Sequence, residues 1–495
     1  MNSSLTPTIV ILVIVAYFAV LLMISYFTSK KADNSDFFLA NRSSPWYLVA
    51  IGMIGASLSG VTFISIPGVV GTDGHNENFS YLQVVLGYLI GYMIIARVLL
   101  PIYYKYNLTT IYGFLEQRLG WGAYKSGSAF FILSRLVGAS FRLFLVATVL
   151  QVMIMDSFGI NFATTVVITI LLIWSYTYKG GIKTIVVTDT LQTVFMVGAV
   201  ILTIVGICNA LDLSAMDIWP RIKGEGMGQI FYFENGWSDP NNFFKQVISG
   251  ALLTIVMTGL DQDMMQKNLT CKSLPDAQKN MFVFSGLLVV ANIIFLSLGA
   301  LMYIYAAEFS IEIPERSDQL YPTLAMYYLP TVVGILFLIG LLAAAYSSAD
   351  SALTALTTAF CIDFLNFEKN EDLTEKEGQR QRFYVHIAFS IILAVIIIGF
   401  NQLNSGSVIN DLFNASGYTY GPILALFCFA MWLNRSINPM YVIGVCIASP
   451  IISFILNMNS EVWFGGLKFG FLILLVNATI TFLLLLLFSK EKRHG

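Results

Sequence analysis

The chain has 495 residues, of which 57% are hydrophobic and only 11% charged, and its formal net charge is -2. Soluble chains carry about 25% charged residues, so this composition excludes an ordinary soluble domain and favours lipid as the solvent. The near-neutral charge argues against a nucleic-acid partner, and five scattered cysteines without a CxxC pair argue against a disulfide framework or a metal site.

Apolar runs long enough to cross a bilayer recur along the chain. The run at 7–28 has no basic residue before it and no small-residue cleavage site, which indicates a retained membrane helix rather than a signal peptide. About thirteen spans are predicted, the others at 46–67, 80–101, 126–154, 159–178, 184–209, 243–265, 279–306, 328–360, 383–400, 412–433, 437–457 and 464–488. The loop 210–242 is either a partly ordered lid or a simple solvated loop.

Small and hydroxyl residues crowd the second span from Gly55 to Thr62, followed by Pro67. Glycine lowers the cost of unwinding a helix, and freed carbonyls can then coordinate a cation. Close helix packing through small residues would produce the same pattern. Both readings stay open on the sequence.

Two further spans carry charges. Arg135 and Arg142 stand seven residues apart, on one face of the fourth span, where Arg142 could bind a substrate carboxylate or pair with a structural acid. Asp189 follows the Gly180-Gly181 turn, and it is either functional or a carboxylate that stabilises a helix N-terminus.

The ninth span contains Ser347, Asp350 and Ser351, whose spacing of i, i+3 and i+4 puts them on one helix face. Hard cations prefer oxygen ligands, which hydroxyls and a carboxylate provide. Ionisable groups are costly inside a membrane, so this cluster indicates a cation site.

Lys and Arg residues predict the orientation. With the N-terminus outside, one set of loops holds nineteen of them, among them Lys267 and the basic residues of the charged linker 366–382. The opposite set holds five, namely Arg221, Lys223, Lys245, Arg316 and Lys468. We therefore expect the N-terminus outside and the C-terminus in the cytoplasm.

Taken together, the motifs resemble the sodium:solute symporter family over about 35–488. They occur in the order Phe37-Phe38-Leu39-Ala40, Ser57 to Phe63, Ile66-Pro67, Gly180-Gly181, Asp189, Gln192, Asp261-Gln262-Asp263, Gln266, Ser347-Ser348, Ser351 and Gly421-Pro422. The resemblance implies one all-α integral membrane domain of the leucine-transporter type. It would consist of an extra first helix at 7–28, inverted five-helix repeats at about 46–209 and 243–433, and two extra helices within 437–488.

The resemblance also implies site residues. One sodium ion would be held by the carbonyls of Gly55, Leu58 and Ala344 and the hydroxyls of Ser347 and Ser348. A candidate second cation site comprises Asp189, Asp350 and Ser351, where Asp350 replaces a hydroxyl of similar carriers. Sialic acid carriers contact their sugar at positions that correspond to Ser57, Ser59, Thr62, Phe79 and Gln83, and place a carboxylate-binding arginine near Arg142.

The expected function is sodium-coupled import of a small polar solute, such as a sugar, a sugar acid or another small organic solute, by alternating access. Its partners would be the solute, sodium and the bilayer of the inner or plasma membrane. One alternative is a proton-coupled carrier of the same fold that uses Asp189 and Asp350. Another is a membrane sensor or enzyme, which the missing HExxH, GxSxG and P-loop motifs disfavour.

Overall fold

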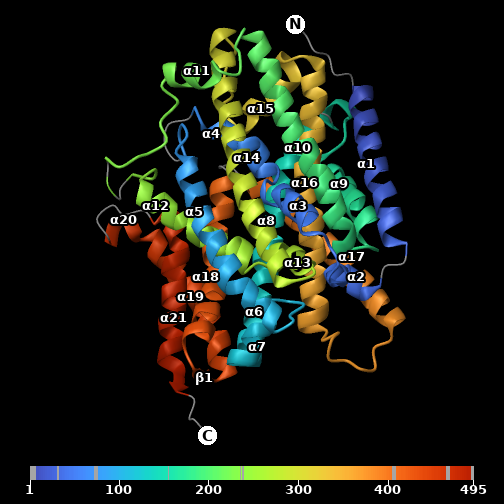
Figure 1. Cartoon of the computed structure of the whole chain (residues 1–495), viewed down its shortest axis with the longest axis vertical. Coiled ribbons are helices and arrows are strands. Elements are labelled where there is room, and N and C mark those ends of the chain that lie inside the picture. Colours follow the sequence, from blue (N-terminus) through green and yellow to red (C-terminus); the bar gives the residue numbers. More distant parts are fainter. Residues whose placement is uncertain are drawn as a thin grey trace.

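A computed structural model describes residues 7–30, 33–71, 76–153, 155–234, 236, 239–403, 408–463 and 469–491. The described chain is almost entirely helical (Figure 1). The first half comprises α1 (Pro7–Ser29), α2 (Asn34–Leu39), η1 (Ala40–Arg42), α3 (Trp46–Ser57), α4 (Gly60–Val69), α5 (Tyr81–Ile94), η2 (Ile95–Leu99), α6 (Leu100–Lys105), α7 (Gly113–Leu119), α8 (Trp121–Met153), η3 (Met155–Phe158), α9 (Phe162–Thr177), α10 (Ile182–Ala210) and α11 (Ile218–Gly224).

The second half comprises α12 (Phe243–Thr254), η5 (Ile255–Gly259), α13 (Gln262–Leu269), α14 (Leu274–Glu308), η6 (Ser317–Gln319), α15 (Leu320–Thr323), η7 (Leu324–Tyr328), α16 (Thr331–Ala359), η8 (Phe360–Phe364), α17 (Glu375–Leu403), α18 (Val408–Trp432), α19 (Pro439–Met458), α20 (Ser460–Trp463), η9 (Gly470–Leu472) and α21 (Ile473–Phe488). Strands β1 (Arg435–Ile437) and β2 (Ser489–Glu491) pair antiparallel after α18 and α21. This short ribbon ties the ends of those two helices together.

Eight helices of the described chain are long and apolar enough to cross a membrane, or ten if each of two bent pairs is one span. The predicted spans 159–178 and 464–488 correspond to α9 and α21, which have only 16 residues each. The predicted span 412–433 lies in α18. The count of thirteen therefore includes helices that are short for a full crossing, while 464–468 and both chain ends lie outside the described residues.

The two bent pairs are α3–α4, with an angle of 61°, and α12/η5–α13, with an angle of 63°. Each forms the first span of one predicted repeat. Leu58 and Ser59 leave the helical region at the first break, with ψ angles of 65° and 175°. At the second, the Asp261 carboxylate accepts hydrogen bonds from the amides of Asp263 and Met264 and so starts α13 as a new helix.

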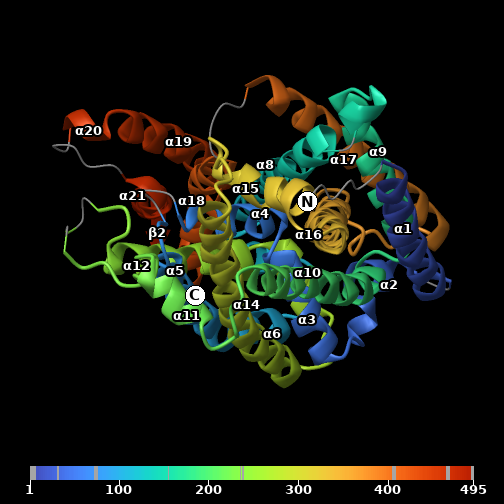
Figure 2. The same cartoon turned by 90° about the horizontal axis from the view of Figure 1, so that it is seen from above.

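Helix α16 runs through the interior of the bundle, with α8, α9, α10 and α17 packed around it (Figure 2). In the most apolar stretch of 18 residues of this span, 78% of the residues are buried, compared with 28% in the peripheral α1. Helix α16 packs against α10, α8 and the α3–α4 pair. Small residues from Ala343 to Ala345 allow this close packing on several sides. The polar residues of α16 are consequently held between other helices, away from lipid.

Candidate functional site

The α3–α4 break lies directly against α16. A Cβ atom on Gly55 would be 3.1 Å from Ser347 Oγ, and one on Gly60 would be 3.9 Å from the Cα of Ala345. The missing side chain of Gly55 therefore lets the break approach Ser347 of α16, whereas a Cβ on Gly60 would lie 2.5 Å from Val146 Cγ2 of α8. The contact with α16 brings the carbonyl groups around Leu58 toward the hydroxyls of the ninth predicted span.

The residues expected to hold sodium lie in this region, but their hydroxyls point in different directions. Ser348 Oγ lies 3.3 Å and 3.2 Å from the carbonyl oxygens of Ala344 and Ala345. Ser347 Oγ instead donates to Asp189 Oδ1 over 2.8 Å. Carbonyl and hydroxyl oxygens are hard donors that suit an alkali cation.

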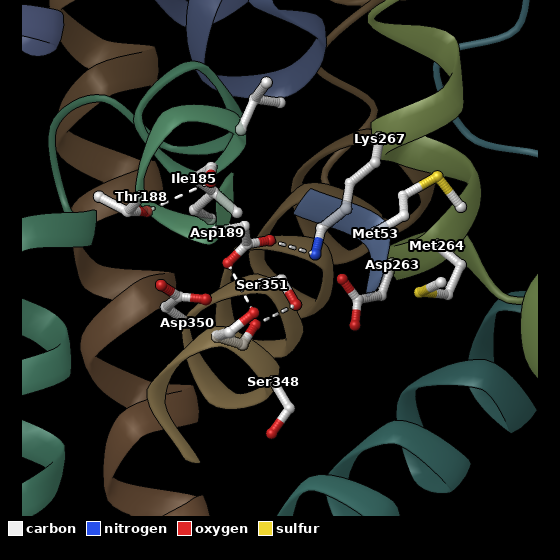
Figure 3. Close-up of polar contacts among 12 residues, drawn as sticks. Met53, Ile185, Thr188, Asp189, Asp263, Met264, Lys267, Ser348, Asp350 and Ser351 are labelled. Atoms are coloured by element: carbon white, nitrogen blue, oxygen red, sulfur yellow. Dashed lines mark hydrogen bonds and ion pairs between the residues drawn. The ribbon is translucent and has the colours of Figure 1, made fainter. Parts of the chain in front are cut away.

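Asp189 is paired with Lys267, which was predicted to lie in a cytoplasmic loop. Lys267 is 1% exposed, and its Nζ lies 2.6 Å from Asp189 Oδ2 (Figure 3). The assignment of Lys267 to a solvated loop was therefore wrong, because α13 continues past the break and carries the lysine into the protein. The sequence spacing gives no signal of this burial, because a lysine four residues after an aspartate is also typical of an exposed helix face.

Asp350 lies beside this ion pair (Figure 3). Its Oδ2 accepts a hydrogen bond of 2.8 Å from Tyr176, and its Oδ1 is buried without a partner among the described residues. Ser351 Oγ donates to the Ser347 carbonyl over 3.1 Å. The structure thus brings Asp189, Asp350 and Ser351 together. If both carboxylates are ionised, one ammonium group leaves a formal charge of -1, which favours a further cation.

A cavity of about 100 Å³ adjoins the α3–α4 break. Its wall is formed by Ala56, Ser57, Leu58, Ser59, Thr62, Tyr81, Tyr88, Tyr92, Arg135, Arg142, Leu253, Thr254, Met257, Thr258, Met264, Leu288 and Asn292. Pockets for drug-sized ligands usually measure about 300–1,000 Å³, so this one must widen to admit a sugar-sized solute.

Four of the six predicted substrate residues line the cavity: Ser57, Ser59, Thr62 and Arg142. Three tyrosines of α5 also line the cavity and were not predicted as site residues, although Tyr81, Tyr88 and Tyr92 recur at helical spacing on one face. The hydroxyls of Tyr81 and Tyr88 lie 2.8 Å apart. The cavity therefore combines aromatic rings with hydroxyls and a guanidinium group, which is a surface suited to a small polar solute.

The two arginines of α8 have different partners. Arg135 forms ion pairs with Asp263 and, over 3.7 Å, with Asp261, which also accepts a hydrogen bond from Tyr420. Within the described part of the chain Arg142 forms no ion pair, although Asp261 attracts its charge, and its Nε is buried without a hydrogen-bond partner there. The sequence left two partners open for Arg142, a substrate carboxylate or a structural acid. The described residues pair acids with Arg135 and show no such ion pair for Arg142.

The other two predicted substrate residues do not line this cavity. Gln83 donates to the Asn241 carbonyl over 2.8 Å and to Gln246 over 3.2 Å, and it accepts from the Tyr232 amide. Phe79 packs edge-on against Trp219. Both residues therefore connect the start of α5 to the long loop before α12, a pairing that spacing along the sequence does not reveal.

Comparison with known proteins gives a consistent picture. The model of the sodium:solute symporter family matches residues 37–440. The sodium/sialic acid symporter SiaT of Proteus mirabilis is 23% identical over 451 residues, covering 88% of this chain and 87% of SiaT. The mouse sodium-coupled monocarboxylate transporter 1 is 26% identical over 417 residues, covering 80% of this chain and 64% of the mouse protein.

Solved structures share the fold. A substrate-bound, outward-open sodium-coupled sialic acid symporter superposes with a TM-score of 0.81 at 20% identity, covering 98% of this chain and 99% of that one. Mhp1, a transporter of the nucleobase-cation-symport-1 family, in a closed conformation with bromovinylhydantoin bound, gives a TM-score of 0.54 at 16% identity, covering 92% of this chain and 94% of that one. These likenesses confirm the expected leucine-transporter type of fold.

Proposed function

The chain belongs to the sodium:solute symporter family and is a sodium-coupled symporter of small organic solutes, and from this premise we propose that its solute carries a carboxylate that Arg142 binds. The observation that carries the proposal is the guanidinium group of Arg142 at the cavity wall, which forms no ion pair with an acid among the described residues. The Nε of Arg142 is buried without a hydrogen-bond partner among the described residues, so an anionic ligand that accepts a bidentate pair of hydrogen bonds would gain most at this point.

Charges elsewhere in the cavity support this proposal. Asp261 and Asp263 are engaged by Arg135, so Arg142 keeps its charge available for the solute. The relatives include carriers named for sialic acid and for monocarboxylates. The hydroxyls of Ser57, Ser59 and Thr62 would bind polar groups on the rest of the solute.

The test uses pairs of solutes that differ only in a carboxylate, such as glucuronate and glucose or lactate and propanediol. Sodium-dependent thermal stabilisation of the purified protein reports binding. We expect stabilisation by an acid but not by its neutral partner. Arg142→Gln should lower solute affinity about 10- to 100-fold, as for the loss of a charged hydrogen bond, while Arg142→Lys retains part of it. Equal stabilisation by the neutral partners, or unchanged affinity in Arg142→Gln, contradicts the proposal.

We further propose that sodium is bound by the carbonyls of Gly55, Leu58 and Ala344 and the hydroxyls of Ser347 and Ser348. The close approach of the α3–α4 break to α16 supports this ligand set. A second cation would bind between Asp189, Asp350 and Ser351. The unpartnered Asp350 oxygen and the formal charge of this cluster support it.

The transporter is a multi-pass membrane protein. We propose that it lies in the inner or plasma membrane, with its N-terminus outside the cell and its C-terminus in the cytoplasm. After Lys267 is removed from the count, eighteen Lys and Arg residues remain on the proposed cytoplasmic side, against five on the other. Such an excess is typical of cytoplasmic loops.

A further inference from the structure

A second depression of the molecule lies apart from the sodium and solute sites. It measures about 490 Å³ and is bordered by the end of α5 with η2, by α12/η5, and by α18 and α21. Helices α5, α12, α18 and α21 gather on one side of the molecule in both views (Figures 1 and 2). We refer to the depression as the α5–α21 groove. Its volume lies within the range of small-molecule sites, which is about 300–1,000 Å³.

The wall of the α5–α21 groove offers almost nothing to a polar ligand. Thr479 is its only residue with a hydroxyl group, and that hydroxyl donates to the Leu475 carbonyl of its own helix over 2.7 Å. Several wall residues are open to the surroundings, with exposed fractions of 44% for Val98 and 58% for Leu483. In a membrane protein these surfaces face the bilayer, so the part of a ligand inside the groove must be apolar.

A charged side chain stands beside this apolar wall. Arg97 follows Ile94 by three residues and precedes Val98, and both of these line the groove. Its side chain is exposed, and it forms no hydrogen bond or ion pair with any residue that the structure describes. An ionisable residue inside a span is costly, so an unpaired arginine there indicates a ligand or an interface.

The position of Arg97 along its span limits the choice of ligand. Arg97 lies eight residues before Lys105, the end of the span Tyr81–Lys105, which corresponds to about 12 Å along a helix. An arginine can extend its guanidinium group over such a distance toward the headgroup region. Trp432, 71% exposed at the same groove, is a residue type enriched at that depth.

We propose that the α5–α21 groove binds one anionic phospholipid, with an acyl chain against α18 and α21 and the phosphate group at Arg97. An apolar channel with a cation at its rim matches the two parts of such a lipid. Basic pockets between transmembrane helices bind anionic headgroups, which provides the charge complementarity. Arg435 and Lys490 of the β1–β2 ribbon add positive charge beyond Trp432, with Glu491 opposite Arg435. The inference does not depend on which solute is carried.

Native mass spectrometry of the purified full-length protein tests this site. The protein is mixed with phosphatidylglycerol and phosphatidylcholine of the same acyl composition, and the retained copies of each are counted. We expect the wild type to retain one phosphatidylglycerol in preference to phosphatidylcholine. Arg97→Gln should reduce that preference about fivefold, as expected for one charge near the headgroups, and Arg97→Lys should keep it.

A bulky variant tests the groove itself. Thr479→Trp places a ring into the groove and should abolish retention of both lipids, whereas Val395→Trp, at an exposed position of α17 outside the groove, should retain them. Sodium-dependent thermal stabilisation verifies that each variant is folded. Retention of no lipid, of free fatty acid or detergent alone, or of both phospholipids equally by the wild type overturns the proposal, as does an unchanged preference in Arg97→Gln.

Discussion

The hydroxyl of Ser348 offers the most direct test of the sodium site at the scale of single residues. Ser348 is 1% exposed, and its hydroxyl lies within hydrogen-bond distance of two carbonyl oxygens of its own helix. Ser348→Ala removes one ligand of a desolvated cation, and water cannot replace that ligand without a large cost in free energy. We expect sodium affinity in uptake assays to fall about 10- to 100-fold.

Ser453 provides a matched control for this prediction. Its hydroxyl is buried on α19 and donates to the Ser449 carbonyl over 2.8 Å, outside the site. Ser453→Ala should therefore keep wild-type sodium dependence. If Ser348→Ala also keeps it, Ser348 does not bind the ion.

The pair of Lys267 and Asp189 makes a prediction about stability. Lys267→Met would leave the Asp189 carboxylate buried beside Asp350 without its ammonium partner, which costs about 3–5 kcal/mol. Thermal unfolding in detergent should show a large loss in Lys267→Met and a smaller one in the double variant with Asp189→Asn. Additive losses would mean that the two side chains do not depend on each other.

Asp350 is the residue that distinguishes one bound cation from two. Asp350→Asn has nearly the same shape, and its amide oxygen can still accept from Tyr176, but the formal charge is gone. If Asp350 helps to bind a second sodium, the Hill coefficient for sodium in proteoliposome uptake should fall. Tyr176→Phe removes the hydrogen bond and keeps the charge of Asp350, so it should retain the wild-type Hill coefficient for sodium. An unchanged Hill coefficient in Asp350→Asn assigns the carboxylate to structure.

At the scale of elements, Gln83 joins α5 to α12 and to the loop that precedes it. Its side-chain amide forms hydrogen bonds with Asn241, Gln246 and the Tyr232 backbone amide. A substitution of Gln83 should therefore first weaken the attachment of this loop to α5. Gln83→Leu should destabilise the protein by about 1–3 kcal/mol, because it leaves buried partners unsatisfied.

A double-mutant cycle with Gln246→Leu separates the two roles of Gln83. If Gln83 acts through the loop, the two substitutions should be non-additive in thermal unfolding and should weaken solute binding equally. A loss of solute affinity in Gln83→Leu alone would instead place Gln83 in the solute site, as its resemblance to sialic acid carriers implies.

For the whole molecule, the sequence predicts what depends on local pattern. The apolar runs predict most spans, and the glycines from Gly55 to Gly60 predict the first break within a few residues. The sequence does not predict pairings between distant segments. Lys267 and Asp189 are 78 residues apart, and Gln83 and Gln246 are 163 apart, so only packing of the helices brings them together. For this reason the lysine was assigned to solvent and the glutamine to the solute.

The orientation in the membrane is the remaining property of the whole molecule that an experiment must decide. The Pro7 end of α1 and the Phe488 end of α21 lie at opposite ends of the molecule (Figure 1), so the two termini should face opposite sides of the bilayer. The excess of basic residues predicts that the linker before α17 is cytoplasmic. A cysteine at the exposed Glu371 should therefore escape an impermeant thiol reagent added to intact cells, and react only after lysis.

Met216 provides the opposite control, since it is 89% exposed in the loop predicted to be external, and Met216→Cys should react in intact cells. The native cysteines interfere little because four are buried, and Cys428, which is partly buried, can be replaced by alanine in the parent protein. Labelling of the Glu371 cysteine in intact cells together with protection of the Met216 cysteine would reverse the orientation. In that case the charge excess would lie outside, and solute and sodium would enter from the face that we assign to the cytoplasm.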